Sequence, residues 1–283
     1  MIDSFVSSWA LFQNAYLSGW LIGILLSLIG VLVVARDQIF IGAAVSQASL
    51  LGIALGIWSG GLLGPDSWWN SDLVHSLMGG LFAVLAAFLT TGGGRRAGQE
   101  THEAITGWVF LFSVSASILL LAHSPHGMEE VNRLLSSTII GARTEDVWIF
   151  AGMALLTGTA FVVYYRSILL VTLDPVMARA AGLRTGLWDG LLSTWLGLAV
   201  GFSIRVSGVV FAFASLVLPA LVAKSLGRTA GSLFILAPLV SLGMSVFAFI
   251  VANAYDYPPG QMAAACLALL LAAVWLFRAM RPR

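Results

Sequence analysis

The chain has 283 residues, of which 59% are hydrophobic and only 10% are charged, and its formal net charge is +1. A soluble domain is roughly 45–50% apolar and roughly 25% charged, so this chain has too few polar side chains to cover a surface in water. The composition excludes a soluble enzyme, a nucleic-acid-binding protein and a disordered chain. It predicts an integral membrane protein.

Charged residues divide the chain into nine charge-free stretches. Seven of them have about the 20 residues that a bilayer-spanning helix needs. The two that flank Arg205 have 15 and 18 residues, so they form either two short spans that meet at a turn over 205–208 or one overlong span. The stretches are 4–35, 38–65, 73–94, 104–128, 147–165, 190–204, 206–223, 229–255 and 257–277.

The distribution of Lys and Arg favours nine spans with an outer N-terminus. One face then carries eleven of the fourteen cations and the other carries only Arg133, Arg143 and Arg205, as the positive-inside rule requires. We therefore expect an all-α, multi-pass membrane protein with eight or nine transmembrane helices, forming one domain over 1–283 with a cytoplasmic C-terminus. Short spans are tolerated where protein or a cavity surrounds them, so residues 190–223 should lie near a central pathway.

Glycines recur at four-residue spacing in three of these stretches. Such ridges let helix backbones approach closely in lipid, and we interpret them as packing within the chain, with contact between two copies as the alternative. The glycines are Gly52, Gly56, Gly60 and Gly64, the pair Gly19 and Gly23, and the pair Gly197 and Gly201.

Residues 172–184 predict a short cytoplasmic helix. Asp174 is a natural N-cap, Pro175 suits the first helical position, and Gly182 suits the left-handed residue that ends a helix. The helix would have about two turns and would be marginal alone in water, so we expect it to pack against its own loop or against a partner. Its small-residue surface would consist of Ala178, Ala181 and Gly182.

The chain has no phosphate-binding loop, because its only lysine, Lys224, follows Ala223 and not glycine. We therefore do not expect an enzyme, and any ATP hydrolysis should occur on a separate polypeptide. No carboxylate or histidine lies deep inside an expected span, which argues against a proton-coupled carrier.

The stretch from Asp174 to Gly182 resembles the coupling-helix signature of the membrane subunits of metal-ion ABC importers, the zinc, manganese and iron permease family. Three further segments resemble the family at the expected spacing, so the similarity covers nearly the whole chain. They are Arg36 with residues 42–52, residues 207–220, which include Pro219, and residues 255–260.

The resemblance implies a homodimeric permease of the inner membrane that imports a divalent transition metal by alternating access. It implies a path at the subunit interface, cytoplasmic ATPase subunits that dock on the short helix and carry the ATP, and an extracytoplasmic binding protein that delivers the metal. Besides lipid and these proteins no partner is expected, and neither is a resident cofactor or a nucleic acid. The expected ATPase-coupling residues are Asp174, Pro175, Ala178 and Gly182.

One segment departs from the family. Much of the family has Gly-Asp-Ala-x-Ser-His at the start of the second span, whereas this chain has Gly42-Ala43-Ala44-Val45-Ser46-Gln47. Positions 43 and 47 share a helix face, so the family's carboxylate and imidazole are replaced there by a methyl group and a neutral amide. Ser46 and Gln47 are candidates to line the path, together with Pro219, and an interhelical hydrogen bond is the alternative for the first two.

The expected outer loop contains His123, His126 and Glu129, which are candidates for a metal-entry site. The alternative is a solvated loop with a turn at Pro125. The single cysteine, Cys266, lies in an apolar run, and we interpret it as a small packing residue.

Two other functions stay open. A permease for an iron chelate or siderophore would need no metal ligands at positions 43 and 47. A gradient-driven carrier without an ATPase partner is disfavoured by the capped cytoplasmic helix and by the lack of intramembrane charge.

Overall fold

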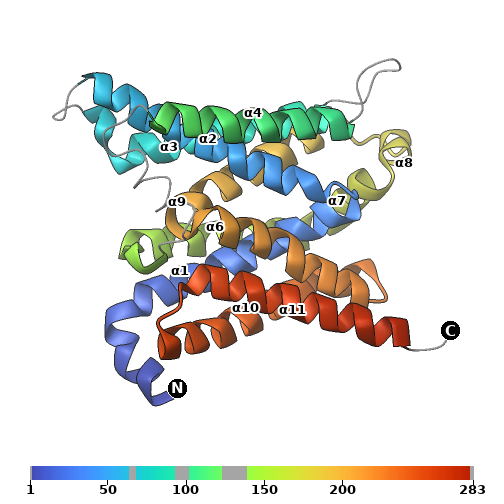
Figure 1. Cartoon of the computed structure of the whole chain (residues 1–283). Helices are drawn as coiled ribbons and strands as arrows, with labels where there is room; N and C mark the ends of the chain where they lie inside the picture. Colours follow the sequence, from blue (N-terminus) through green and yellow to red (C-terminus); the bar gives the residue numbers. More distant parts are fainter. Residues whose placement is uncertain (1, 64–67, 93–101, 123–138, 281–283) are drawn as a thin grey trace. The chain divides into compact units, whose positions relative to one another are not determined.

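The computed structural model describes residues 2–63, 68–92, 102–122 and 139–280, and within them every regular element is a helix (Figure 1). This confirms the all-α prediction. The elements are α1 (Ile2–Ala35), α2 (Ile39–Leu63), η1 (Trp68–Asn70), α3 (Asp72–Gly92), α4 (His102–Ala122), η2 (Ile139–Gly141), α6 (Thr144–Val163), α7 (Tyr165–Leu173), α8 (Pro175–Ala180), α9 (Thr185–Leu226), α10 (Ala230–Tyr255) and α11 (Pro259–Met280).

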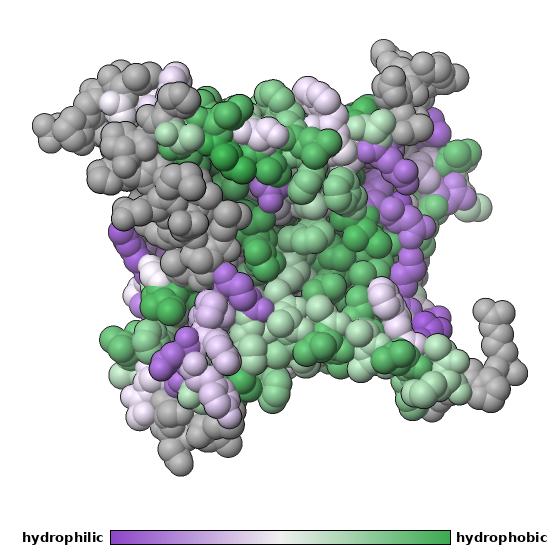
Figure 2. All heavy atoms as spheres, in the orientation of Figure 1, coloured by the Kyte–Doolittle hydropathy of each residue, from purple (hydrophilic) through white to green (hydrophobic). Residues whose placement is uncertain are grey.

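Eight of the helices in the described ranges are long and apolar enough to cross a bilayer. The difference from nine lies in α9, whose 42 residues contain both short stretches that flank Arg205. Gly208, at the end of the expected turn, interrupts α9 with non-helical φ 77° and ψ 167°. The face shown in Figure 2 is mostly apolar over the described helices, as a lipid-facing surface should be.

Packing contacts give the direction of each arm of α9. In the first arm, Gly197 lies against Val84 and Gly201 against Gly80, so this arm runs antiparallel to α3. In the second arm, Leu216 lies against Gly30, and Lys224 reaches the carbonyl of Val34, so this arm runs parallel to α1.

The chain forms two compact units. Unit 1 comprises Met1–Asp37, Ser136–Val163 and Val206–Arg283, and unit 2 comprises Gln38–Leu135 and Tyr164–Arg205. Two of the crossings between the units lie next to Asp37, which has a left-handed φ of 52°, and near the non-helical Gly208. The single permease domain expected over 1–283 stays a prediction.

Unit 1 is built around α1, which packs along α10 and α6. Gly19 faces the ring of Phe249, and Gly23 faces the hydroxyl of Ser241, so both glycines of the predicted ridge allow close helix packing. At the end of α1, the Lys224 ammonium donates to the Asp37 carboxylate over 2.9 Å. Cys266 is buried in α11, which confirms its interpretation as a packing residue.

Unit 2 is built around α2, which packs against α3 and α4. Gly52 meets the backbone of Met78, and Gly56 meets the ring of His75, so these members of the predicted ridge also pack within the chain. The Thr91 and Ser193 hydroxyls lie 2.9 Å apart and add a polar contact between α3 and α9. Intrachain packing therefore accounts for these glycines without a second copy.

Candidate functional site

The short helix α8 has the capping predicted from the sequence. The Asp174 carboxylate accepts the N–H groups of Val176 and Met177 over 3.1 and 2.9 Å, and Pro175 occupies the first turn. Gly182 has a φ of +81°. Its N–H donates to the carbonyl of Arg179 over 3.0 Å, so the last turn of the helix is closed by a left-handed residue as expected.

The exposed face of α8 differs from the prediction. Ala178 is completely buried, so its expected place on a small-residue surface is wrong, whereas Ala181 and Gly182 are exposed as expected. Val176 and Met177 are 68% and 61% exposed instead. The side of α8 that turns inward carries Ala178, and the larger apolar side chains of Val176 and Met177 are left outside. A charge at Ala178 would dislodge the helix and would not test a contact with a partner.

The short helix α8 therefore has an exposed apolar face. Leu173, at the end of α7, adds a third apolar side chain that is 59% exposed. Such a patch beside a rigidly capped turn is suited to contact another protein. The patch formed by Leu173, Val176 and Met177 is called the α8 patch below.

The segment of α2 that departs from the family has a mixed environment. Ala43 and Gln47 are half-buried and lie on one helix face, whereas Ser46 is completely buried. Among the described residues, the Ser46 hydroxyl has no hydrogen-bond partner, so the interhelical bond that was the alternative for Ser46 is not formed there. The face of residues 43 and 47 presents no carboxylate or imidazole for a metal.

The second arm of α9 contains Pro219, which is buried inside the helix. Proline has no N–H, so the carbonyl of Ser215, four residues earlier, lacks its helical donor. The Ser215 hydroxyl is also buried, without a partner in the part of the chain that is described. At Ser215 and Pro219, the second arm of α9 therefore lacks one helical hydrogen bond and contains a buried polar side chain. The helix should bend more easily there.

Sequence reasoning missed two polar residues of α10. The side chains of Ser241 and Ser245 are completely buried, and a Cβ at Gly23 would lie 2.8 and 3.6 Å from their hydroxyl oxygens. Neither hydroxyl has a partner within the described residues. Their four-residue spacing along α10 and the glycine on α1 were the signals available in the sequence.

The three candidate metal residues His123, His126 and Glu129 lie outside the described residues. Within the ranges that the structure describes, no group of three or more His, Cys, Asp or Glu side chains could hold a metal ion. The structure therefore describes the capped helix α8 and the polar residues of α2 and α9. The metal-entry site stays a prediction.

The half-exposed pair on α2 can be tested by restoring the family's residues. We expect Ala43→Asp combined with Gln47→His to lower the metal concentration for half-maximal uptake by about tenfold, because the new carboxylate and imidazole would share one helix face. The measurement is the concentration dependence of uptake. Ala43→Asn with Gln47→Asn is the control, since it adds polarity without such ligands, and an unchanged metal dependence of the first variant would remove residues 43 and 47 from the path.

Comparison with known proteins gives matches over almost the whole chain. The sequence profile of the ABC 3 transport family matches residues 8–278. A probable metal transport system membrane protein of Thermotoga maritima is 27% identical over 88% of this chain and 84% of its own length. The manganese transport system membrane protein MntC of Halalkalibacterium halodurans is 23% identical, over 95% of this chain and 88% of its own length.

A solved structure also matches. The fold resembles a chain in the structure of PsaBC from Streptococcus pneumoniae in complex with Fab, with a TM-score of 0.80 over 97% of this chain and 95% of that chain. At 20% identity, this likeness shows the fold.

Proposed function

The chain belongs to the ABC 3 transport family, and from that premise we propose that it is the permease subunit of an ABC importer for a divalent transition metal. Relatives named for metal and manganese transport support this substrate class. The observation that carries the mechanism is α8, a capped helix whose apolar patch has no covering element among the contacts of the described chain.

Two copies of the chain would pair in the inner membrane, with the path between them and with the C-terminus and α8 in the cytoplasm. The positive-inside rule supports this orientation, because Arg36, Lys224 and Arg228 all flank the ends of unit 1 helices on the proposed cytoplasmic side. An extracytoplasmic binding protein would deliver the metal to the opposite side.

The ATPase subunit would contact the α8 patch. Asp174, Pro175 and Gly182 would hold the helix in shape, Ala178 would seat it on α7, and Val176 and Met177 would meet the partner. ATP-driven closure of the ATPase subunits would push on α8, and this movement would open the path alternately to the two sides. Ser46, Gln47 and Pro219 are proposed to line that path.

Uptake of Zn²⁺, Mn²⁺ and Fe²⁺ tests this function. Cells that lack their own importers would express this chain together with the ATPase and binding protein encoded next to it. The control is identical except that its ATPase is inactive. We expect accumulation of one ion that disappears in the control. Equal accumulation with the active and inactive ATPase would contradict the proposal.

A metal chelate is the second candidate substrate. Ala43 and Gln47 favour it, because a chelated metal brings its own ligands and needs none from this helix face. Uptake that occurs only when the metal is supplied as a chelate would identify this substrate, whereas uptake of the free ion would exclude it.

A further inference from the structure

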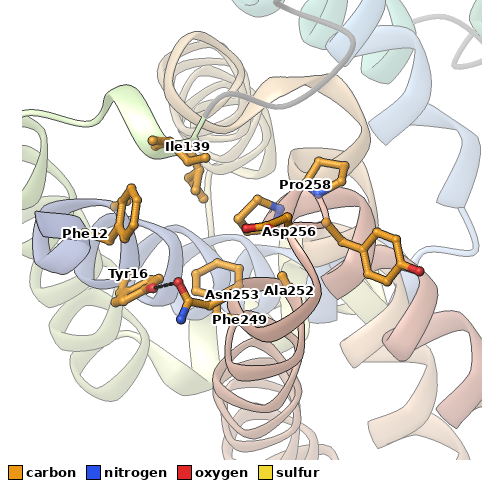
Figure 3. A pocket seen from close by; sticks show the side chains of 12 residues that line it. Phe12, Tyr16, Ile139, Phe249, Ala252, Asn253, Asp256 and Pro258 are labelled. Carbon is orange, nitrogen blue, oxygen red and sulfur yellow. Dashed lines mark hydrogen bonds between the residues drawn. The ribbon is translucent and has the colours of Figure 1, made fainter. Parts of the chain in front are cut away.

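Unit 1 contains a cavity of about 330 Å³ where α10 ends and α11 begins (Figure 3). Residues from α1 and η2 complete its walls. The cavity, called the α10–α11 pocket below, is lined by four aromatic residues and otherwise mostly by small or aliphatic ones. The side chains that concern its chemistry are Phe12, Tyr16, Phe249, Asn253, Asp256 and Tyr257.

The polar wall of the pocket has a fixed arrangement. The Asn253 side-chain oxygen accepts hydrogen bonds from the Tyr16 hydroxyl and the Ser8 hydroxyl, each over 3.2 Å. Tyr16 also packs against Phe249, with ring centroids 5.9 Å apart. This network holds the aromatic rings in place before any ligand arrives.

Asp256 places a negative charge where the helix end disfavours one. It ends α10 in the left-handed region, with φ 54° and ψ 34°, where glycine or asparagine is usual. Its carboxylate also lies at the negative end of the helix dipole, where an anion is unfavourable. Aspartate adopts the left-handed conformation more readily than most side chains, so it is the charge at the helix end that local stability does not explain.

The Asp256 carboxylate has no hydrogen bond or ion pair within the described part of the chain, and the residue is exposed. Near this end of unit 1, the first turn of α6 carries another exposed carboxylate, Glu145, whereas Asp146 is buried and accepts the N–H of Arg143 over 2.9 Å. The exposed carboxylate of Asp256 is therefore the charge beside the pocket, and it attracts a cationic group.

Two tyrosines flank the carboxylate in the sequence. Tyr255 and Tyr257 are 61% and 56% exposed, and their rings stack with centroids 6.2 Å apart. Exposed tyrosines beside a pocket are typical of protein interfaces, where they supply large contact areas at little entropic cost. A bare metal ion fits the pocket poorly, because Asp256 is the only carboxylate in its lining and hard cations require several oxygen ligands.

We propose that the α10–α11 pocket receives an arginine side chain of the extracytoplasmic binding protein when that protein docks on the permease. A guanidinium is planar, stacks on aromatic rings and donates to a carboxylate through two N–H groups, so it matches both the rings and Asp256. The proposal rests on the proposed function, which places this end of unit 1 outside the cell.

The test is the affinity of the metal-loaded binding protein for the importer, assembled with its ATPase in lipid nanodiscs. We expect Asp256→Asn to weaken binding by about tenfold, a loss of about 1.4 kcal/mol. The same change should leave the thermal unfolding temperature unchanged or raised, because asparagine tolerates the left-handed conformation and removes the charge at the helix end. If Asp256 had a purely structural role, the loss of affinity would be accompanied by a lower unfolding temperature.

Glu145→Gln is the matched control, because it removes one exposed negative charge from the same end of unit 1 but lies outside the pocket. It should leave the affinity within about twofold of wild type. Asp256→Arg should abolish docking, and exchange of one binding-protein arginine for aspartate should restore it.

An unchanged affinity of Asp256→Asn, or an equal loss in Glu145→Gln, would overturn the proposed arginine site while leaving the importer function intact. Failure of the wild-type importer both to bind the protein and to transport would instead contradict the proposed function.

Discussion

Gly182→Pro is expected to reduce metal uptake by the assembled importer to the level of the ATPase-dead control. Gly182 has a φ of +81°, and its N–H donates to the carbonyl of Arg179. Proline requires a φ near −65° and has no N–H, so this substitution removes the turn that closes α8. The misplaced α8 patch could no longer receive force from the ATPase, and the measurement is uptake beside ATP hydrolysis in proteoliposomes.

Gly182→Asn is the matched control for this turn. Asparagine tolerates the left-handed conformation and keeps the N–H donor, and open space surrounds the position where its Cβ would lie. Uptake by this variant should be at least half of the wild-type value, and the protein level in the membrane should be the same for both variants. Normal uptake by Gly182→Pro would show that α8 does not transmit the ATPase movement.

Gly30→Ala is expected to destabilise unit 1 by about 3 kcal/mol. A Cβ at Gly30 would overlap the carbonyl oxygen of Leu216. The obstacle is backbone, which cannot rotate away as a flexible side chain could, so α1 and the second arm of α9 must separate. The measurement is the thermal unfolding midpoint of the purified protein in detergent, together with the yield of monodisperse protein.

Gly243→Ala provides the comparison within the same unit. Gly243 lies in α10, and a Cβ there would meet no atom within 4 Å, so the substitution should be neutral or slightly stabilising because alanine favours a helix. Equal midpoints for Gly30→Ala and Gly243→Ala would contradict the close approach of α1 and α9.

These two predictions concern different links between structure and transport. The contact of Gly30 with Leu216 holds the second arm of α9 against α1. Pro219, which interrupts the helical hydrogen bonds, lies in the same arm. The Gly182 turn holds the surface on which an ATPase would act. A permease needs both closely packed helices and a rigid surface on which the ATPase can act.

The cap of α8 could be predicted because it depends on neighbouring residues. Asp174, Pro175 and Gly182 each determine local backbone geometry through their own chemistry, and the structure has all three features. The burial of Ala178 could not be predicted in the same way, because it depends on how α8 lies against the rest of the chain.

The break in α9 shows the same division. Charge and length predicted an interruption between residues 205 and 208, and Gly208 provides it. The helices against which the two arms pack could not be predicted from the sequence, since the contact of Gly30 with Leu216 joins residues far apart in the chain.

By itself, the sequence determined the membrane environment, the helical class, the capped α8 and the location of the break in α9. Each of these follows from hydropathy, charge or short-range backbone chemistry. Only the tertiary structure decided which glycines are crowded, that Val176 and Met177 face outward in place of Ala178, and that Asp256 lines a pocket with rings from α1 and α10. The physical reason is that burial and pocket formation depend on contacts between residues far apart in the chain, and a single sequence does not say which of these residues meet.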